Sequence, residues 1–114
     1  MILVPEYMNL SSNGGAATAH GGLMGIYKLQ DEYHNKFHVW KKEGEDDKYL
    51  FVNGKGVWAI FSDLDDTLPW IYNLKMYPTP GSPQLTDDWV YWDGEWKTDN
   101  TMRMEPVTDK FLIN

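Results

Sequence analysis

Hydrophobic and polar residues alternate in short runs along most of the chain, and turn-forming residues separate the runs at short intervals. Two of these runs are residues 25–29 and 37–41, whereas residues 49–52 are apolar throughout. Alternation with a period of two is typical of strands, because successive side chains of a strand point to opposite faces of a sheet. No segment carries an apolar period of about 3.6 residues over three turns, as an amphipathic helix would. The pattern predicts an all-β protein.

The clearest hairpin signal is Asn53-Gly54, which separates two strongly apolar runs. A two-residue type I′ turn, with positive φ at both residues, would pair Leu50 with Val57, and a four-residue loop over 53–56 would pair Val52 with Val57. Both registers place the same residues together: Leu50, Val52, Val57, Ala59 and Phe61 on one face, and Tyr49, Phe51, Trp58 and Ile60 on the other. Because both faces are apolar, we expect this hairpin at the centre of the sheet.

Two further hairpins are expected, one on each side of the central one. A polar turn at His34-Asn35 joins residues 25–29 to 37–41, and Asp93-Gly94 joins residues 89–92 to 95–98, with Tyr91 opposite Trp96. The remaining strand candidates are residues 2–4, 70–76 and 102–107. We therefore predict an antiparallel meander of about six to eight strands, folded into a small sandwich or barrel.

Chain length and composition predict a single domain over residues 1–114. Residues 11–22 are small and rich in glycine and alanine, so we expect a flexible surface loop there.

The net charge of -7 argues against nucleic acid and anionic membranes as partners, because both would be repelled. No apolar run is long enough to cross a bilayer. The chain has no cysteine, and its first residues have no basic region of the kind that begins a signal peptide, so an intracellular location is favoured. Neutral ligands such as glycans, and basic protein partners, remain compatible with this charge.

Residues 63–68, Asp-Leu-Asp-Asp-Thr-Leu, resemble motif I of haloacid-dehalogenase-type phosphatases. That resemblance implies that Asp63 is the nucleophile, that Asp65 is the acid/base, and that both hold magnesium. The fold also needs parallel strands with long crossovers, whereas the short chain after Leu68 contains prolines and a hairpin signal. We interpret the motif as an acidic loop after a strand. A magnesium-dependent phosphatase is the alternative, and a calcium site that includes Asp66 is a weaker one.

The three histidines, His20, His34 and His38, do not have the spacing of a metal site on strands and loops. We predict no catalytic residues and no cofactor.

Six tryptophans and seven tyrosines are more than one small core is expected to absorb. In the last hairpin we expect Trp89, Tyr91 and Trp96 on one face and Trp92 on the other, so we expect Trp92 to be an exposed ring. Our candidate ligand-binding residues are Trp92, Trp70 and Tyr77. An exposed tryptophan among acidic residues suits a glycan ring, or a cationic or proline-rich segment of a protein partner.

The order of short motifs also resembles a Trp-rich β-module that recurs in predicted proteins of protists, algae and marine invertebrates. The matching residues are Gly25-x-Tyr27, His34-Asn35, Val39-Trp40-Lys41-Lys42, Tyr49-Leu50-Phe51, Trp58-x-Ile60, Pro78-x-Pro80, Trp89 and Asp93-Gly94-x-Trp96. The chain departs from the family pattern at His38, where proline is usual, and at Lys36-Phe37, which replaces Gly-Arg. The resemblance implies an all-β interaction module without catalytic residues. We therefore expect a non-enzymatic module that presents aromatic side chains to a glycan or protein partner, in an oligomeric state that the sequence leaves open.

Overall fold

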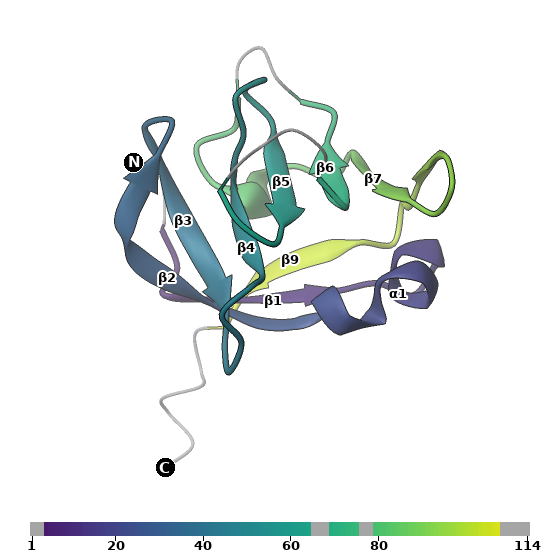
Figure 1. The fold of residues 1–114 in the computed structure, drawn as a ribbon, viewed down its shortest axis with the longest axis horizontal. Helices are drawn as coiled ribbons and strands as arrows, with labels where there is room; N and C mark the ends of the chain where they lie inside the picture. Colours follow the sequence, from purple (N-terminus) through teal and green to yellow (C-terminus); the bar gives the residue numbers. More distant parts are fainter. Residues whose placement is uncertain (1–3, 65–68, 76–78, 108–114) are drawn as a thin grey trace.

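The computed structural model describes residues 4–64, 69–75 and 79–107, and in them nine antiparallel strands form one curled sheet, a half-open barrel (Figure 1). The strands are β1 (Tyr7–Ser11), β2 (Gly25–His34), β3 (Phe37–Lys42), β4 (Tyr49–Val52), β5 (Trp58–Phe61), β6 (Ile71–Asn73), β7 (Trp89–Trp92), β8 (Trp96–Thr98) and β9 (Arg103–Pro106). Their order is β8-β7-β6-β5-β4-β3-β2-β1-β9, so the chain meanders from β1 to β8 and returns to place β9 beside β1. The predicted all-β antiparallel meander is confirmed.

The core lies on the inner face of the curled sheet. Strand register aligns its side chains across neighbouring strands: Trp40 is opposite Leu50, Leu50 is opposite Ile60, and Ile60 is opposite Ile71. Each of these side chains is fully buried, and each large apolar side chain buried in this way contributes roughly 1.5–3 kcal/mol. The other buried members of this cluster are Met8, Leu10, Ala16, Leu23, Tyr27, Val52, Trp58, Trp89, Tyr91, Met102 and Met104.

Buried aromatic side chains also fasten the loops to the sheet. The indole N–H of Trp40 donates to the carbonyl of Pro5 at 3.0 Å, and that of Trp58 donates to the carbonyl of Pro80 at 2.7 Å. A buried aromatic ring with a polar tip satisfies that tip best on a nearby backbone carbonyl. In the same way, the indole N–H of Trp89 donates to the carbonyl of Thr86, and the hydroxyl of Tyr27 donates to the carbonyl of Leu23.

The central hairpin is present, but both predicted registers are wrong. The register with Val52 opposite Val57 is off by one residue, and the register with Leu50 opposite Val57 is off by three. Asn53 N–H donates to Val57 O at 2.9 Å, and Gly56 N–H donates to Asn53 O at 3.0 Å, which closes a three-residue loop. Positive φ occurs at Gly56 (82°) and not at Asn53 or Gly54. This is a type I turn followed by a left-handed glycine bulge. The type I′ geometry occurs instead between β2 and β3, at Asn35 (φ 52°) and Lys36 (φ 75°).

This register exchanges the faces of β5. Leu50 lies opposite Ile60 and Val52 lies opposite Trp58, so Trp58 and Ile60 point into the core. Val57, Ala59 and Phe61, which both predicted registers place on one face with Leu50 and Val52, instead share the outer face with Tyr49 and Phe51. Phe51 and Ala59 are fully buried on that face as well. A slip of one residue moves every side chain of a strand to the other face.

The last hairpin shows the same difference. Residues 93–95 form its loop, with a positive φ at Gly94 (97°), and Trp92 lies opposite Trp96. The predicted pairing of Tyr91 with Trp96 is therefore wrong, because Tyr91 lies opposite Lys97. Trp96 consequently shares the outer face with Trp92.

The N-terminal region also differs from expectation. Residues 1–3 lie outside the described residues, and the first strand of the described part is β1, which follows Pro5 and buries Met8 and Leu10. The expected loop over 11–22 contains the short helix α1 (Gly15–Ala19) and the start of a 3₁₀ turn, η1 (Gly21–Leu23). Ala16 of α1 is fully buried, so this segment does contribute to the core. A second 3₁₀ turn, η2 (Pro83–Leu85), precedes β7.

Asp99 fastens the two ends of the curled sheet together. Strands β8 and β9 lie at opposite edges, yet only residues 99–102 connect them, so the edges must approach each other closely at this corner. The buried Asp99 carboxylate accepts hydrogen bonds from Ser12 Oγ (2.6 Å), Ala16 N–H (2.9 Å), and both N–H (2.8 Å) and Oγ1 (2.6 Å) of Thr101. It thereby joins the end of β1, the start of α1 and the start of β9.

Burial raises the pKa of the Asp99 carboxyl, but the hydrogen bonds from Ser12, Thr101 and Ala16 together outweigh burial and hold the pKa below its ordinary value. The charged form is therefore the one that folding stabilises.

We expect Asp99→Asn to lower the free energy of unfolding at pH 7 by about 1–3 kcal/mol, because charge-assisted hydrogen bonds are lost. Since folding depresses this pKa, the contribution is present above the ordinary aspartate pKa and is lost as pH falls below about 4. Urea titrations from pH 7 to pH 3 should show the difference between the wild type and the variant shrinking as the pH falls. Asp87→Asn, at an exposed carboxylate, is the control. A difference that stays constant over this pH range would contradict the assignment.

We also expect Gly15→Ala to destabilise the protein by about 1–3 kcal/mol. A Cβ at this position would lie 1.8 Å from the hydroxyl oxygen of Tyr91, a ring that is itself buried in the core. Gly21→Ala is the matched control, because nothing lies within 4 Å of a Cβ there. Thermal unfolding of both variants should separate them, and equal stability would show that α1 does not pack tightly on β7.

Candidate functional site

Five aromatic side chains form one row across the outer face of the sheet. Tyr49 lies opposite Phe61, and the Phe61 ring lies 5.0 Å from that of Trp70. The backbone N–H of Trp92 donates to the backbone carbonyl of Trp70 at 3.0 Å. Trp92 lies opposite Trp96, and the centroids of their rings are 5.2 Å apart. We call this set, Tyr49, Phe61, Trp70, Trp92 and Trp96, the aromatic row.

The aromatic row becomes more exposed toward the sheet edge at β8. Tyr49, Phe61 and Trp70 are half-buried, whereas Trp92 is 45% and Trp96 is 38% exposed. The expectation that Trp92 is an exposed ring is confirmed. Clustered exposed aromatic rings are uncommon on a small protein and often mark a binding surface.

A shallow pocket of about 210 Å³ lies at this exposed end, lined by Pro69, Trp70, Trp92 and Trp96. The rings of Trp92 and Trp96 meet at 64°, and Tyr72 stands at 77° against Trp96 with their centroids 4.7 Å apart. The surface is therefore ridged and notched rather than flat. Whereas the indole N–H groups of the three fully buried tryptophans donate to backbone carbonyls, those of Trp70, Trp92 and Trp96 have no acceptor among the described residues.

Two contacts hold the exposed hairpin in place. Lys97 Nζ lies 3.0 Å from Asp93 Oδ2 across the β7–β8 turn, and this hydrogen bond raises the pKa of Lys97. His20 Nε2 donates to Trp92 O at 2.6 Å, so that nitrogen carries the proton. The Gly/Ala-rich segment thus supports the tryptophan that is most exposed.

The predicted ligand-binding residues Trp70 and Trp92 come together in this pocket. The third, Tyr77, lies outside the described residues. Sequence reasoning did not include Trp96, because the predicted hairpin register put it on the inner face. The signal that would have found it is the Asp-Gly turn itself, if its loop is taken as three residues with the glycine in the left-handed region.

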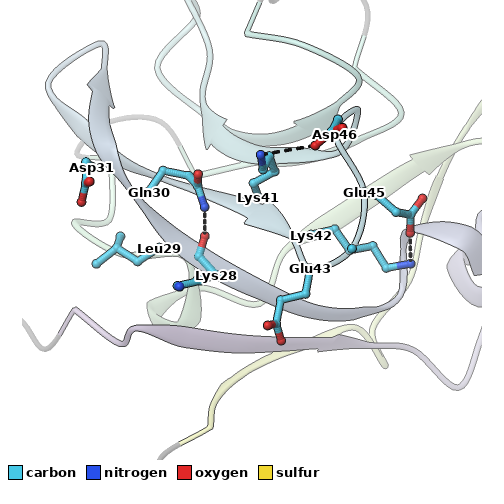
Figure 2. Close-up of a pocket in the computed structure, with 10 residues that line it drawn as sticks. Lys28, Leu29, Gln30, Asp31, Lys41, Lys42, Glu43, Glu45 and Asp46 are labelled. Atoms are coloured by element: carbon cyan, nitrogen blue, oxygen red, sulfur yellow. Dashed lines mark hydrogen bonds and ion pairs between the residues drawn. The ribbon is translucent and has the colours of Figure 1, made fainter.

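A second, polar pocket of about 440 Å³ lies between β2, β3 and the loop after β3 (Figure 2). The lining residues are Lys28, Leu29, Gln30, Asp31, Lys41, Lys42, Glu43, Gly44, Glu45 and Asp46. The hollow accompanies a register shift in β2 between Leu29 and Tyr33, where three residues of β2 face a single residue of β3.

The charges of this polar pocket compensate one another. Lys42 Nζ lies 2.7 Å from Glu45 Oε2, and Lys41 Nζ lies 3.7 Å from Asp46 Oδ1. Dashed lines mark both pairs in Figure 2. Lys48 Nζ approaches the other oxygen of Glu45 at 2.6 Å. Hydrogen bonds from Lys42 and Lys48 lower the pKa of Glu45, and the bond to Glu45 raises that of Lys48. These pairs organise the loop and leave little net charge for a ligand.

The phosphatase-like motif receives no support from the sheet. Asp63 is exposed after β5, and Asp65 lies outside the described residues. Every strand pair in the described part of the chain is antiparallel, whereas that enzyme fold is built on parallel strands. Within the same residues no three His, Asp or Glu side chains are grouped as metal ligands.

Quenching of tryptophan fluorescence by acrylamide should reach the outer rings only. We expect Trp92→Phe combined with Trp96→Phe to remove most of the quenchable emission, since Trp40, Trp58 and Trp89 are fully buried. Tyr33→Phe, at an exposed ring outside the row, is the control. Quenching that is unchanged in the double variant would contradict the arrangement of the aromatic row.

None of the helices among the described residues has the length and apolar character needed to cross a membrane. Comparison with protein-family models, curated proteins and solved structures gives no match to this chain. The resemblance to Trp-rich β-modules therefore stays a prediction.

Proposed function

We propose that this chain is a non-enzymatic binding module that receives its ligand at the exposed end of the aromatic row. The observation that carries the proposal is the convergence of three tryptophans on one pocket: Trp70 from the segment before β6, and Trp92 and Trp96 from the two strands of the β7–β8 hairpin. The meander buries three other tryptophans completely, so this chain does have a core that accepts indole rings. Complete burial of a large apolar side chain contributes roughly 1.5–3 kcal/mol, and a ligand that covers the exposed parts of Trp92 and Trp96 gains a share of that energy.

The chemistry of the pocket favours binding rather than catalysis. Its described lining residues are one proline and three tryptophans, and they place no carboxylate, imidazole or hydroxyl group in it. Indole rings offer a large apolar surface with few torsions to immobilise, which is why tryptophan is prominent among the residues that dominate binding energies. Trp92 and Trp96 sit on the paired strands β7 and β8, and Trp70 directly precedes β6; paired strands hold a binding surface more rigidly than loops do.

The test is a binding screen of the purified chain on immobilised glycans and on immobilised proline-rich peptides. We expect at least one class to bind the wild type, and we expect Trp92→Ala to weaken it by about 2 kcal/mol, or about thirtyfold, as for a central binding tryptophan. Tyr33→Ala, which removes an exposed ring elsewhere, should bind like the wild type. Circular dichroism checks that both variants are folded.

Absence of binding to both classes would contradict this proposal. So would a ligand whose affinity is unchanged in a folded Trp92→Ala variant, because it would bind elsewhere on the protein.

A further inference from the structure

The proposed binding site has a spacing that fits one kind of extended chain. Trp70, Trp92 and Trp96 lie on three consecutive segments of the sheet, and neighbouring strands are about 4.8 Å apart, so the two ends of the set are about 9.6 Å apart. A polyproline II helix rises about 3.1 Å per residue and repeats every three residues, which is about 9.3 Å. Residues i and i+3 of such a helix face the same side and can contact Trp70 and Trp96 together.

The shape of the site also suits proline rings. The rings of Trp92 and Trp96 are inclined at 64°, and the pocket is a notch beside Trp70 and Pro69. Grooves between inclined aromatic rings receive the puckered rings of proline-rich segments, which are already extended and lose little entropy on binding. A sugar ring that stacks on an aromatic face needs a flat exposed face, and the edge-to-face packing here leaves less of one.

Hydrogen-bonding groups match as well. A polyproline II backbone makes no internal hydrogen bonds, so all its carbonyl groups are available as acceptors. The indole N–H groups of Trp70, Trp92 and Trp96 have no acceptor among the described residues. The site thus offers hydrogen-bond donors, and a polyproline II segment offers acceptors.

Charge selects among proline-rich segments. Asp93 and Glu95 lie on the turn between Trp92 and Trp96, and Lys97 neutralises Asp93 through their 3.0 Å contact. Glu95 is exposed beside them, on a chain of net charge -7. A positively charged side chain next to the bound prolines would approach Glu95, whereas an acidic one would be repelled.

Resting on the proposed function, we propose that the ligand is a proline-rich segment in the polyproline II conformation, with prolines at i and i+3 and an Arg or Lys beside them. The tryptophans contact the prolines, and Glu95 attracts the cationic residue.

The test is calorimetric titration of the full chain with a synthetic peptide that carries a Pro-x-x-Pro repeat followed by two arginines. We expect binding, a loss of about tenfold or more for Trp92→Ala, and a similar loss for a peptide with alanine at the i and i+3 prolines. Replacing both arginines by glutamate should weaken binding about fivefold at low salt and less at high salt. Glu95→Lys should weaken the arginine peptide but not a matched neutral one, and Tyr33→Ala serves as the control.

The outcomes separate this inference from the proposed function. If the peptide does not bind but a soluble oligosaccharide binds the wild type and not Trp92→Ala, the polyproline inference is wrong and the binding module stands. If neither ligand binds, or if Trp92→Ala leaves both affinities unchanged, both proposals are wrong. Binding that does not depend on the arginines or on Glu95 would overturn the charge selection.

Discussion

The structure depends on the Asp99 carboxylate, which lies where the two edges of the curled sheet approach each other. Asp99 lies in the four-residue link between β8 and β9. Its carboxylate accepts hydrogen bonds from Ser12 after β1, from Ala16 in α1 and from Thr101 before β9, so it holds these three elements together. An isolated buried carboxylate would be costly, but one that accepts several hydrogen bonds fixes the geometry of its partners. Because the sheet is held curled, its inner face closes around a core, and its outer face is exposed at the end that carries Trp92 and Trp96.

Register decides which aromatic rings belong to each face. The three-residue loops after Asn53 and Trp92 send Trp58 into the core and bring Trp96 beside Trp92. With two-residue loops the same sequence would place Trp96 on the inner face and Trp58 on the outer face. A few left-handed glycines thus determine whether an aromatic row exists on the outside of the molecule.

The fold class and the positions of the three main hairpins could be predicted from alternation and turn residues, since both are local signals. The registers could not be predicted, because an Asn-Gly or Asp-Gly pair is compatible with several loop lengths. The packing of the whole sheet selects one length, and in it Gly56 and Gly94 adopt the left-handed conformation. The segment containing Ala16 was interpreted as a loop because its composition carries no period, and packing against Tyr91 decides its structure. At the candidate site, Trp70 and Trp92 were predicted, and Trp96 was missed with the register.

The most direct measurement of the central claim uses the indole N–H signals of the six tryptophans in a two-dimensional ¹H–¹⁵N spectrum. During titration with the proline-rich arginine peptide, the signals of Trp70, Trp92 and Trp96 should shift together and saturate at one concentration. Those of the three buried tryptophans, whose N–H groups are already bonded to backbone carbonyls, should stay in place. Shifts confined to residues around the polar pocket, with the outer tryptophan signals unmoved, would contradict the account.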